Sequence, residues 1–197
     1  MPRARVEEVA ERLVGAAGLL PVGHPTDLAT VVGPLVDEDA QRRVLHYRDL
    51  ARQQGRVLLE RDDVPALGWF VGPTIVALDR PGGPLWTEEI FGPLLTMVTA
   101  DGLDEALALA NDTPYALTAG FFSRSPAHLR RAAEELRAGN VYLNRATTGA
   151  LVGRQAFGGY GLSGVGSKAG GPDYLLQFVD PRVVTENTQR QGFVPDL

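Results

Sequence analysis

The chain contains no cysteine among its 197 residues. This absence excludes disulfide bonds, thiolate ligands for a metal and a cysteine nucleophile within these residues. The sequence also lacks any apolar run close to the roughly 20 residues that a membrane-spanning helix needs. The basic N-terminus runs into Glu7 and Glu8 rather than into the apolar core of a signal peptide. We therefore expect a soluble protein of the cytoplasm, without a membrane span.

Histidine is scarce, and the balance of charge is negative. The three histidines, His24, His46 and His128, lie far apart in the sequence. We therefore predict no metal site and no histidine base that would activate Ser163 or Ser167 as a nucleophile. The net charge of -5 argues against nucleic acid as the main partner, because phosphate binding requires clustered Lys and Arg.

The sequence contains enough apolar residues, 44%, to bury one substantial core, so a single globular domain is expected. Hydrophobic periodicity and capping residues predict helices at 6–17, 38–54, 103–111 and 126–137. Short apolar runs predict strands at 57–59, 69–78, 94–98, 118–122 and 141–144, and the stretches 175–179 and 182–185 also look extended. The alternation of strands and helices favours an α/β fold, a mainly parallel sheet with flanking helices.

Two segments carry polar or glycine-rich patterns that suit a binding site. Residues 88–93 read Glu-Glu-Ile-Phe-Gly-Pro and lie between two predicted strands. From the residues alone, a turn with surface acids is favoured over a site for this segment. The loop 147–160 contains Gly149, Gly153 and the pair Gly158-Gly159. These glycines let a ligand approach main-chain N–H groups, which bind carboxylates well. From the residues alone, however, a structural turn that needs positive φ is favoured.

Further polar residues lie near these segments. Asn144 ends a predicted strand, where α/β folds place ligand-binding residues, but a polar turn former fits the position equally well. Arg154, Lys168 and Asp173 are charged residues of the glycine-rich region. We assign them no catalytic role, because charged residues in such loops commonly fix loop geometry or face solvent.

Both segments resemble motifs of one enzyme family. Glu-Glu-Ile-Phe-Gly-Pro at 88–93 is typical of aldehyde dehydrogenases, and it follows Gly-Trp-Phe-Val-Gly-Pro-Thr-Ile at 68–75. Thr-Gly-Ala-Leu-Val-Gly-Arg-Gln-Ala-Phe-Gly-Gly at 148–159 resembles the aldehyde anchor loop of the L-glutamate γ-semialdehyde (1-pyrroline-5-carboxylate) dehydrogenases, a family within that superfamily. Ala156 departs from this pattern, because the family usually has proline there. Supporting similarities extend the resemblance over nearly the whole chain, at 32–35, 111–115, 117–120, 138–144 and 184–188.

The resemblance implies roles for five residues. Glu89 would bind the nicotinamide ribose of NAD, and Phe91 would contact the nicotinamide ring. Gly149 and Ala150 would hold the α-carboxylate and ammonium end of a small-molecule substrate, the semialdehyde. Phe157 would pack on its aliphatic chain.

The resemblance also implies a domain layout and a missing half. Residues 1–180 would form part of the catalytic domain, and 181–197 would form an oligomerisation strand with a C-terminal tail. In that family the catalytic Cys, the base Glu, an oxyanion-hole Asn and the cofactor domain all precede the matched region. We therefore assign no catalytic residue and expect no aldehyde oxidation by this chain alone.

Two hypotheses of function follow. The chain is either part of an NAD-dependent dehydrogenase of proline catabolism or a non-catalytic, aldehyde-dehydrogenase-like module that serves assembly. Exposed apolar patches and sheet edges tend to recruit other chains. Self-association, or association with a complementary chain that carries the cofactor domain, is therefore expected.

Overall fold

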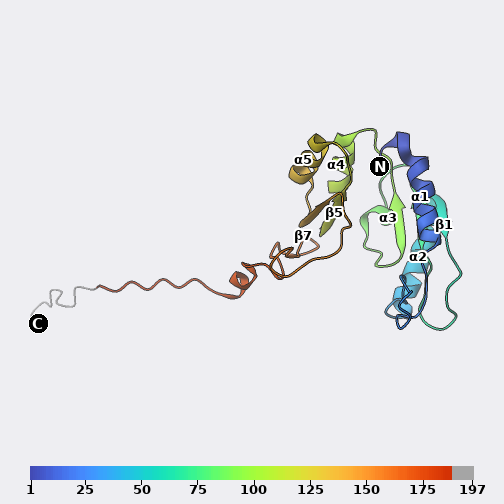
Figure 1. Ribbon diagram of the computed structural model, residues 1–197. Helices are drawn as coiled ribbons and strands as arrows, with labels where there is room; N and C mark the ends of the chain where they lie inside the picture. The colour runs from blue at the N-terminus through green and yellow to red at the C-terminus, as the bar shows by residue number, and fades with distance from the viewer. Residues whose placement is uncertain (188–197) are drawn as a thin grey trace, which may run out of the picture.

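The computed structural model describes residues 1–187 of the chain. Figure 1 shows two neighbouring lobes and a C-terminal tail that runs away from them. We call residues 1–97 the first lobe and residues 103–178 the second lobe. None of the helices in the described part is both long and apolar enough to cross a membrane.

The first lobe consists of a three-stranded sheet between helices. Its strands are β1 (Arg56–Glu60), β2 (Thr74–Ala77) and β3 (Leu94–Met97), in the order β1-β2-β3. β1 and β2 are antiparallel, whereas β2 and β3 are parallel. The helical elements are η1 (Arg3–Arg5), α1 (Val6–Gly18), α2 (Glu38–Gln54) and α3 (Pro84–Thr87). α2 begins where the sequence predicts, because the Asp37 carboxylate accepts a hydrogen bond of 2.7 Å from the Ala40 N–H.

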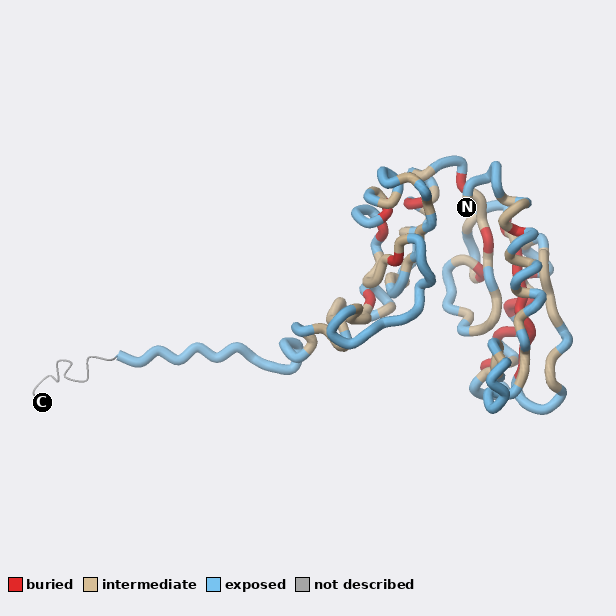
Figure 2. The backbone as a smooth tube through the Cα atoms, in the orientation of Figure 1, coloured by how far each residue is buried: buried red, intermediate tan, exposed pale blue. Residues whose placement is uncertain are grey.

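Successive residues of β2 point to opposite faces of this sheet, so each face has its own core. On one face, Ile75 packs with Ala10 of α1 and Met97 of β3. On the other face, Val76 packs with Ala51 of α2 and Leu85 of α3. Figure 2 shows buried stretches on helices and strands of both lobes, whereas the described part of the tail, 179–187, is exposed.

The second lobe is built around a βαβ unit. β5 (Thr118–Phe121) and β6 (Asn140–Leu143) are parallel neighbours joined by α5 (Pro126–Glu135). Leu107 of α4 (Leu103–Asn111) packs with Ala132 and Leu136 to form the core of this lobe. A second, antiparallel pair comprises β4 (Tyr115–Ala116) and β7 (Tyr160–Gly161). The short helix η2 (Tyr174–Phe178) precedes the tail.

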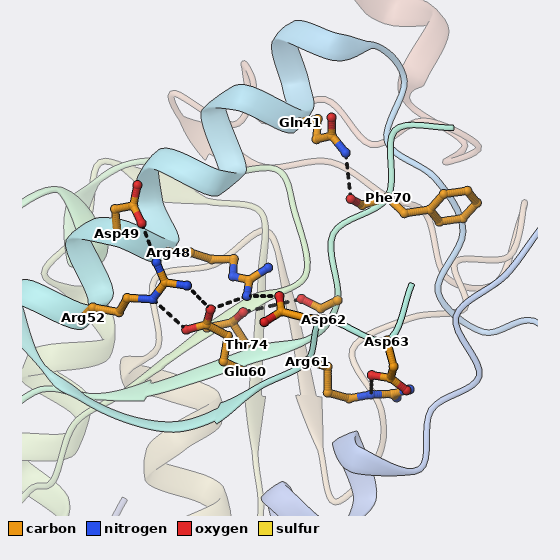
Figure 3. Close-up of polar contacts among 11 residues, drawn as sticks. Gln41, Arg48, Asp49, Arg52, Glu60, Arg61, Asp62, Asp63, Phe70 and Thr74 are labelled. Atoms are coloured by element: carbon orange, nitrogen blue, oxygen red, sulfur yellow. Dashed lines mark hydrogen bonds and ion pairs between the residues drawn. The ribbon is translucent and has the colours of Figure 1, made fainter. Parts of the chain in front are cut away.

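A buried arginine ties α2 to the loop 61–73, which connects β1 to β2 (Figure 3). Arg48 is 4% exposed, and its guanidinium donates hydrogen bonds to Glu60 of β1 and, at 2.6 Å, to Asp62. Arg52 of the next helical turn also donates to Glu60. At the far end of the loop, the Gln41 amide donates to the Phe70 carbonyl at 2.8 Å. Helix α2 therefore holds an irregular loop at both ends.

The structure differs from the predicted fold in three places. The strands form three small sheets rather than one mainly parallel sheet. β1 and β2 are antiparallel because the loop between them contains no helix that would carry the chain back for parallel pairing. The prediction that 175–179 is extended is wrong, since Tyr174–Phe178 forms a 3₁₀ helix.

The oligomerisation strand was predicted for 181–197. The structure assigns no secondary structure to 181–187, and 188–197 lie outside the described residues. This strand and the domain boundary at 180 therefore stay predictions.

Candidate functional site

Helix α2 holds the segment 88–91 through two side-chain hydrogen bonds. The Tyr47 hydroxyl donates a hydrogen bond to the Glu88 carboxylate. This bond, together with burial, raises the pKa of Tyr47 above its usual value. The Arg43 side chain donates to the Ile90 carbonyl at 3.3 Å. Two contacts from one helix face therefore fix the path of the backbone on either side of Glu89.

The packing of Gly92 and the conformation of Phe91 follow from this support. A Cβ at Gly92 would collide with the Val44 side chain of α2, so the backbone approaches the helix more closely than other residues allow. Phe91, the preceding residue, has a φ of 56°. For a bulky residue this left-handed conformation costs about 1–3 kcal/mol, and such outliers cluster at ligand sites.

The two adjacent carboxylates of this segment have different surroundings. Glu88 is bound to Tyr47, whereas Glu89 is exposed and forms no hydrogen bond or ion pair within residues 1–187. The Phe91 side chain is 75% exposed. Glu89 thus has a carboxylate without a bonding partner in the described chain, and Phe91 has an aromatic ring that is largely exposed.

The loop 145–171 folds back on itself through two antiparallel bridges. Leu151 pairs with Gln155, and Phe157 pairs with Ala169 through hydrogen bonds of 3.0 and 2.8 Å. Gly149 has a φ of 99°, a conformation that residues with a side chain rarely adopt. Neither the Gly149 nor the Ala150 N–H donates a hydrogen bond within the described residues. Both residues are exposed, as an anion-binding loop requires.

Lys168 and Asn140 clamp this loop onto the start of β6. The Lys168 ammonium donates to the Gly139 carbonyl at 2.7 Å and to the Gly158 carbonyl. Burial lowers the pKa of Lys168. The Asn140 amide donates to the Ala156 carbonyl at 3.0 Å and accepts from the Gly158 N–H at 3.3 Å. The backbone around Phe157 is therefore held by two side chains that are distant in sequence.

For Lys168 the sequence left two roles open, fixing the loop geometry or facing solvent, and the structure shows the first. Its two carbonyl partners could not be identified from the sequence, because they lie 29 and 10 positions away. Asn140 lies in one of the segments that resemble the dehydrogenases, and that similarity was the available signal.

Arg145 fixes the start of the loop. Its guanidinium donates to the Thr148 carbonyl at 3.2 Å and lies 5.2 Å above the centre of the Tyr142 ring. Arg145 is exposed, and its guanidinium lies 3.4 Å from the position that a Cβ would take at Gly149. A ligand carboxylate at the Gly149 and Ala150 N–H groups would meet a favourable field.

Asn144 has a structural partner rather than a free side chain. Its amide oxygen accepts from the Ser123 N–H at 2.8 Å, and its nitrogen donates to the Ser123 carbonyl at 2.9 Å. These bonds join the ends of β5 and β6 and support a φ of 55° at Asn144.

The Ser163 hydroxyl likewise accepts a hydrogen bond of 3.1 Å from the Ala116 N–H. No group of three or more potential metal ligands occurs in residues 1–187.

The predicted site residues fall into two groups. Glu89 and Phe91 belong to the first lobe, and Gly149, Ala150 and Phe157 belong to the second lobe. No hydrogen bond links the two groups within the described part of the chain.

A family model described as "Aldehyde dehydrogenase family" matches residues 1–184. Curated relatives named 1-pyrroline-5-carboxylate dehydrogenase include that of Geobacillus kaustophilus, which is 41% identical over 180 residues. The Bacillus subtilis relative of the same name is 39% identical. Each match covers 91% of this chain and 35% of the relative. The chain therefore spans about one third of the length of the curated relatives that it matches.

Solved structures agree with these relatives. A 1-pyrroline-5-carboxylate dehydrogenase from Thermus with bound NAD matches with a TM-score of 0.86 at 40% identity. That match covers 91% of this chain and 34% of the Thermus chain. Proline utilization A (PutA) from Bdellovibrio bacteriovorus matches with a TM-score of 0.89 at 44% identity, over 98% of this chain and 20% of the other.

Proposed function

Since the chain belongs to the aldehyde dehydrogenase family, we propose that it forms the C-terminal portion of an NAD-dependent L-glutamate γ-semialdehyde dehydrogenase. Such an enzyme oxidises the semialdehyde, the open form of 1-pyrroline-5-carboxylate, to glutamate in proline catabolism. The single observation that carries this proposal is the free pair of backbone N–H donors at Gly149 and Ala150, in a loop clamped by Lys168 and Asn140. A carboxylate-bearing aldehyde is the substrate class that these donors suit.

The loop 145–171 would hold and orient the substrate. The N–H groups of Gly149 and Ala150 would bind the α-carboxylate, in the field of the Arg145 guanidinium. Phe157, half-buried beside the loop, would pack on the aliphatic chain. Fixing one end of a short substrate limits where its aldehyde carbon can lie, which is the positional part of catalysis.

The residues of this chain that would bind NAD are Glu89 and Phe91. NAD supplies the hydride acceptor for aldehyde oxidation. Glu89 has a free carboxylate that would accept hydrogen bonds from ribose hydroxyls, and Phe91 has an exposed ring that would contact the nicotinamide. The costly φ of Phe91 supports a ligand-facing role, because nothing else in the described residues uses this ring.

The chain by itself has no thiol nucleophile, since the 197 residues contain no cysteine. We therefore infer that it is inactive alone and acts with a polypeptide that carries the nucleophile, the base and the cofactor domain. The test uses the part of the Geobacillus kaustophilus relative that lies outside the 180 matched residues, expressed as its own polypeptide. NADH formation from glutamate γ-semialdehyde is expected for the mixture and for neither component alone.

A matched pair of variants tests the assigned loop residues in that mixture. Ala150→Asp places a carboxylate beside the proposed carboxylate site and should raise KM by about tenfold or more through repulsion. Val152→Asp adds the same charge at a side chain that is 88% exposed in the same loop, and it should change KM little. Equal effects of the two variants would show that the repulsion is not local to Ala150.

The second candidate, a non-catalytic assembly module, is favoured by the lack of cysteine. Purification of the chain from its native cell, with mass spectrometry of co-purifying proteins, separates the two candidates. A cysteine-bearing polypeptide with a cofactor domain would support the enzyme part. A dehydrogenase that is already complete would support the assembly module.

A further inference from the structure

Two side chains bind the carbonyls of the two peptide groups that meet at Gly149. The Arg145 guanidinium donates a hydrogen bond of 3.2 Å to the Thr148 carbonyl. In the amide orientation that satisfies both neighbours, the Gln155 nitrogen donates to the Gly149 carbonyl at 2.5 Å, and the Gln155 oxygen accepts from the Arg145 guanidinium at 2.8 Å. The opposite orientation would set oxygen against oxygen and nitrogen against nitrogen. Arg145 and Gln155 are therefore a bonded pair that binds two successive carbonyls.

These bonds fix the direction of the two free N–H groups. In a trans peptide the carbonyl and the N–H point in opposite directions, and both of these peptides are trans. The Thr148 carbonyl shares its peptide with the Gly149 N–H, and the Gly149 carbonyl shares its peptide with the Ala150 N–H. Because both carbonyls point at the same pair of side chains, both N–H groups point away from that pair.

The backbone freedom of Gly149 makes these bonds necessary. Its φ of 99° is open to glycine, but glycine adopts negative φ about as readily. The peptide between residues 149 and 150 can therefore turn over with little steric resistance. In the turned orientation its carbonyl would take the place of the Ala150 N–H, and the partial negative charge of that carbonyl would repel a ligand carboxylate. The hydrogen bond from Gln155 opposes this turn.

The pair itself is held in place by neighbouring residues. Gln155 is half-buried, and its backbone exchanges hydrogen bonds of 2.7 and 3.0 Å with Leu151. The Arg145 guanidinium lies 5.2 Å above the ring of Tyr142, which is 6% exposed, and a cation is attracted to an aromatic face. Both side chains therefore start from restricted positions, which lowers the entropic cost of binding the two carbonyls.

We propose that Gln155 and Arg145 are positioning residues that keep the Gly149 and Ala150 N–H groups turned toward the substrate carboxylate. The pair acts from the opposite side of the two peptides and does not contact the substrate. This proposal rests on the proposed function, because the ligand is a carboxylate-bearing aldehyde. It makes the pair a determinant of specificity, since an aldehyde without a carboxylate gains nothing from these donors.

One substitution made at two places isolates the pair. Gln155→Met removes the amide and keeps an unbranched side chain of similar length. Gln177→Met makes the same change at an exposed residue of η2, outside the loop 145–171, and serves as the control. Kinetics are measured in the mixture with the remaining part of the Geobacillus kaustophilus relative. The two substrates are glutamate γ-semialdehyde and butanal, which has the same aldehyde end but no carboxylate.

We expect Gln155→Met to raise KM for the semialdehyde about tenfold with kcat nearly unchanged, because the carboxylate is bound equally in the ground state and the transition state. KM for butanal should not change, and Gln177→Met should match the unaltered chain with both substrates. Arg145→Met should also raise KM for the semialdehyde. The double variant should raise it by less than the product of the two single effects, since the two residues act as a pair.

A second measurement uses the chain alone and does not involve catalysis. NMR of the isotopically labelled chain reports the orientation of the peptide 149–150 through the nuclear Overhauser effect between the Gly149 Hα and Ala150 amide protons. We expect one orientation in the unaltered chain and in Gln177→Met, with the Ala150 N–H directed away from Gln155. Gln155→Met should exchange between two orientations.

Three results would overturn the proposal: a single, unchanged peptide orientation in Gln155→Met, an unchanged KM for the semialdehyde in an active mixture, or equal rises of KM for both aldehydes, which would indicate general damage to the loop. An active mixture with an unchanged KM would leave the proposed function intact. A mixture that forms no NADH, together with the expected NMR result, would defeat the proposed function and leave the positioning of the two N–H groups supported.

Discussion

Phe91 combines a left-handed backbone conformation with a side chain that is 75% exposed. Replacement by glycine should remove the conformational cost of about 1–2 kcal/mol and reintroduce about 0.5–1 kcal/mol of glycine chain entropy. Phe91→Gly is therefore expected to be more stable toward urea than Phe91→Ala, which keeps the strained φ. The comparison with alanine cancels the loss of the ring. A Phe91→Gly chain that unfolds before Phe91→Ala would contradict strain at this residue.

Glu60 makes the stability of the chain depend on pH, and its pKa shift sets the direction of this dependence. The hydrogen bond from Arg52 is the largest influence that holds the pKa of Glu60 below its ordinary value of 4.5; burial opposes it, and Arg48 reinforces it. Because the unfolded chain binds this proton more readily, the stabilisation is present above pH 4.5 and is lost as the pH falls through the lower, folded pKa.

We therefore expect the free energy of unfolding of the unaltered chain to fall more steeply below pH 4.5 than that of Glu60→Gln. Chemical denaturation from neutral pH downward measures both curves. Parallel curves would mean that Glu60 does not contribute this dependence.

The N-cap of α2 contributes to stability by an amount that can be measured. Asp37→Ala removes the acceptor for the Ala40 N–H and should lower the free energy of unfolding by about 1 kcal/mol. Asp37→Asn keeps a capping oxygen and should cost only a fraction of this. Denaturant unfolding of the two variants decides the point, and equal losses would assign the effect to the charge of Asp37 rather than to capping.

The glycine-rich loop depends on Lys168. Lys168→Met leaves the carbonyls of Gly139 and Gly158 without their donor, at an expected cost of about 1–3 kcal/mol. Hydrogen exchange at the Phe157 and Ala169 amides should accelerate at the same time. Arg154→Met, which removes an exposed cation of the same loop, is the control and should leave both measurements unchanged. Slow exchange in Lys168→Met would show that the clamp is dispensable.

The sequence predicted the helices better than the sheets. α2 was recognisable because its cap, its periodicity and its exit glycine lie within the segment itself, at Asp37 and Gly55. Strand pairing depends on partners elsewhere in the chain, so the antiparallel turn of β1 onto β2 was not predicted. The same limit applies to the site, where the contact of Lys168 with Gly139 spans 29 positions. Motif resemblance supplied Glu89 and Gly149, whereas the residues alone favoured structural turns at both places.

At the scale of the whole molecule, apolar side chains are exposed on the second lobe and the tail. Phe122, Leu162 and Phe178 are 68–70% exposed, and Val183 and Val184 are 89% and 75% exposed. We expect the free chain to self-associate, so that the mass from light scattering rises across a concentration series. The double variant Val183→Asp with Val184→Asp should reduce this rise. A constant monomer mass in the unaltered chain would contradict the prediction.

The exposed tail also has a consequence for the cell. Proteases and chaperones recognise apolar segments that lack secondary structure, and the described tail 181–187 presents two valines in this state.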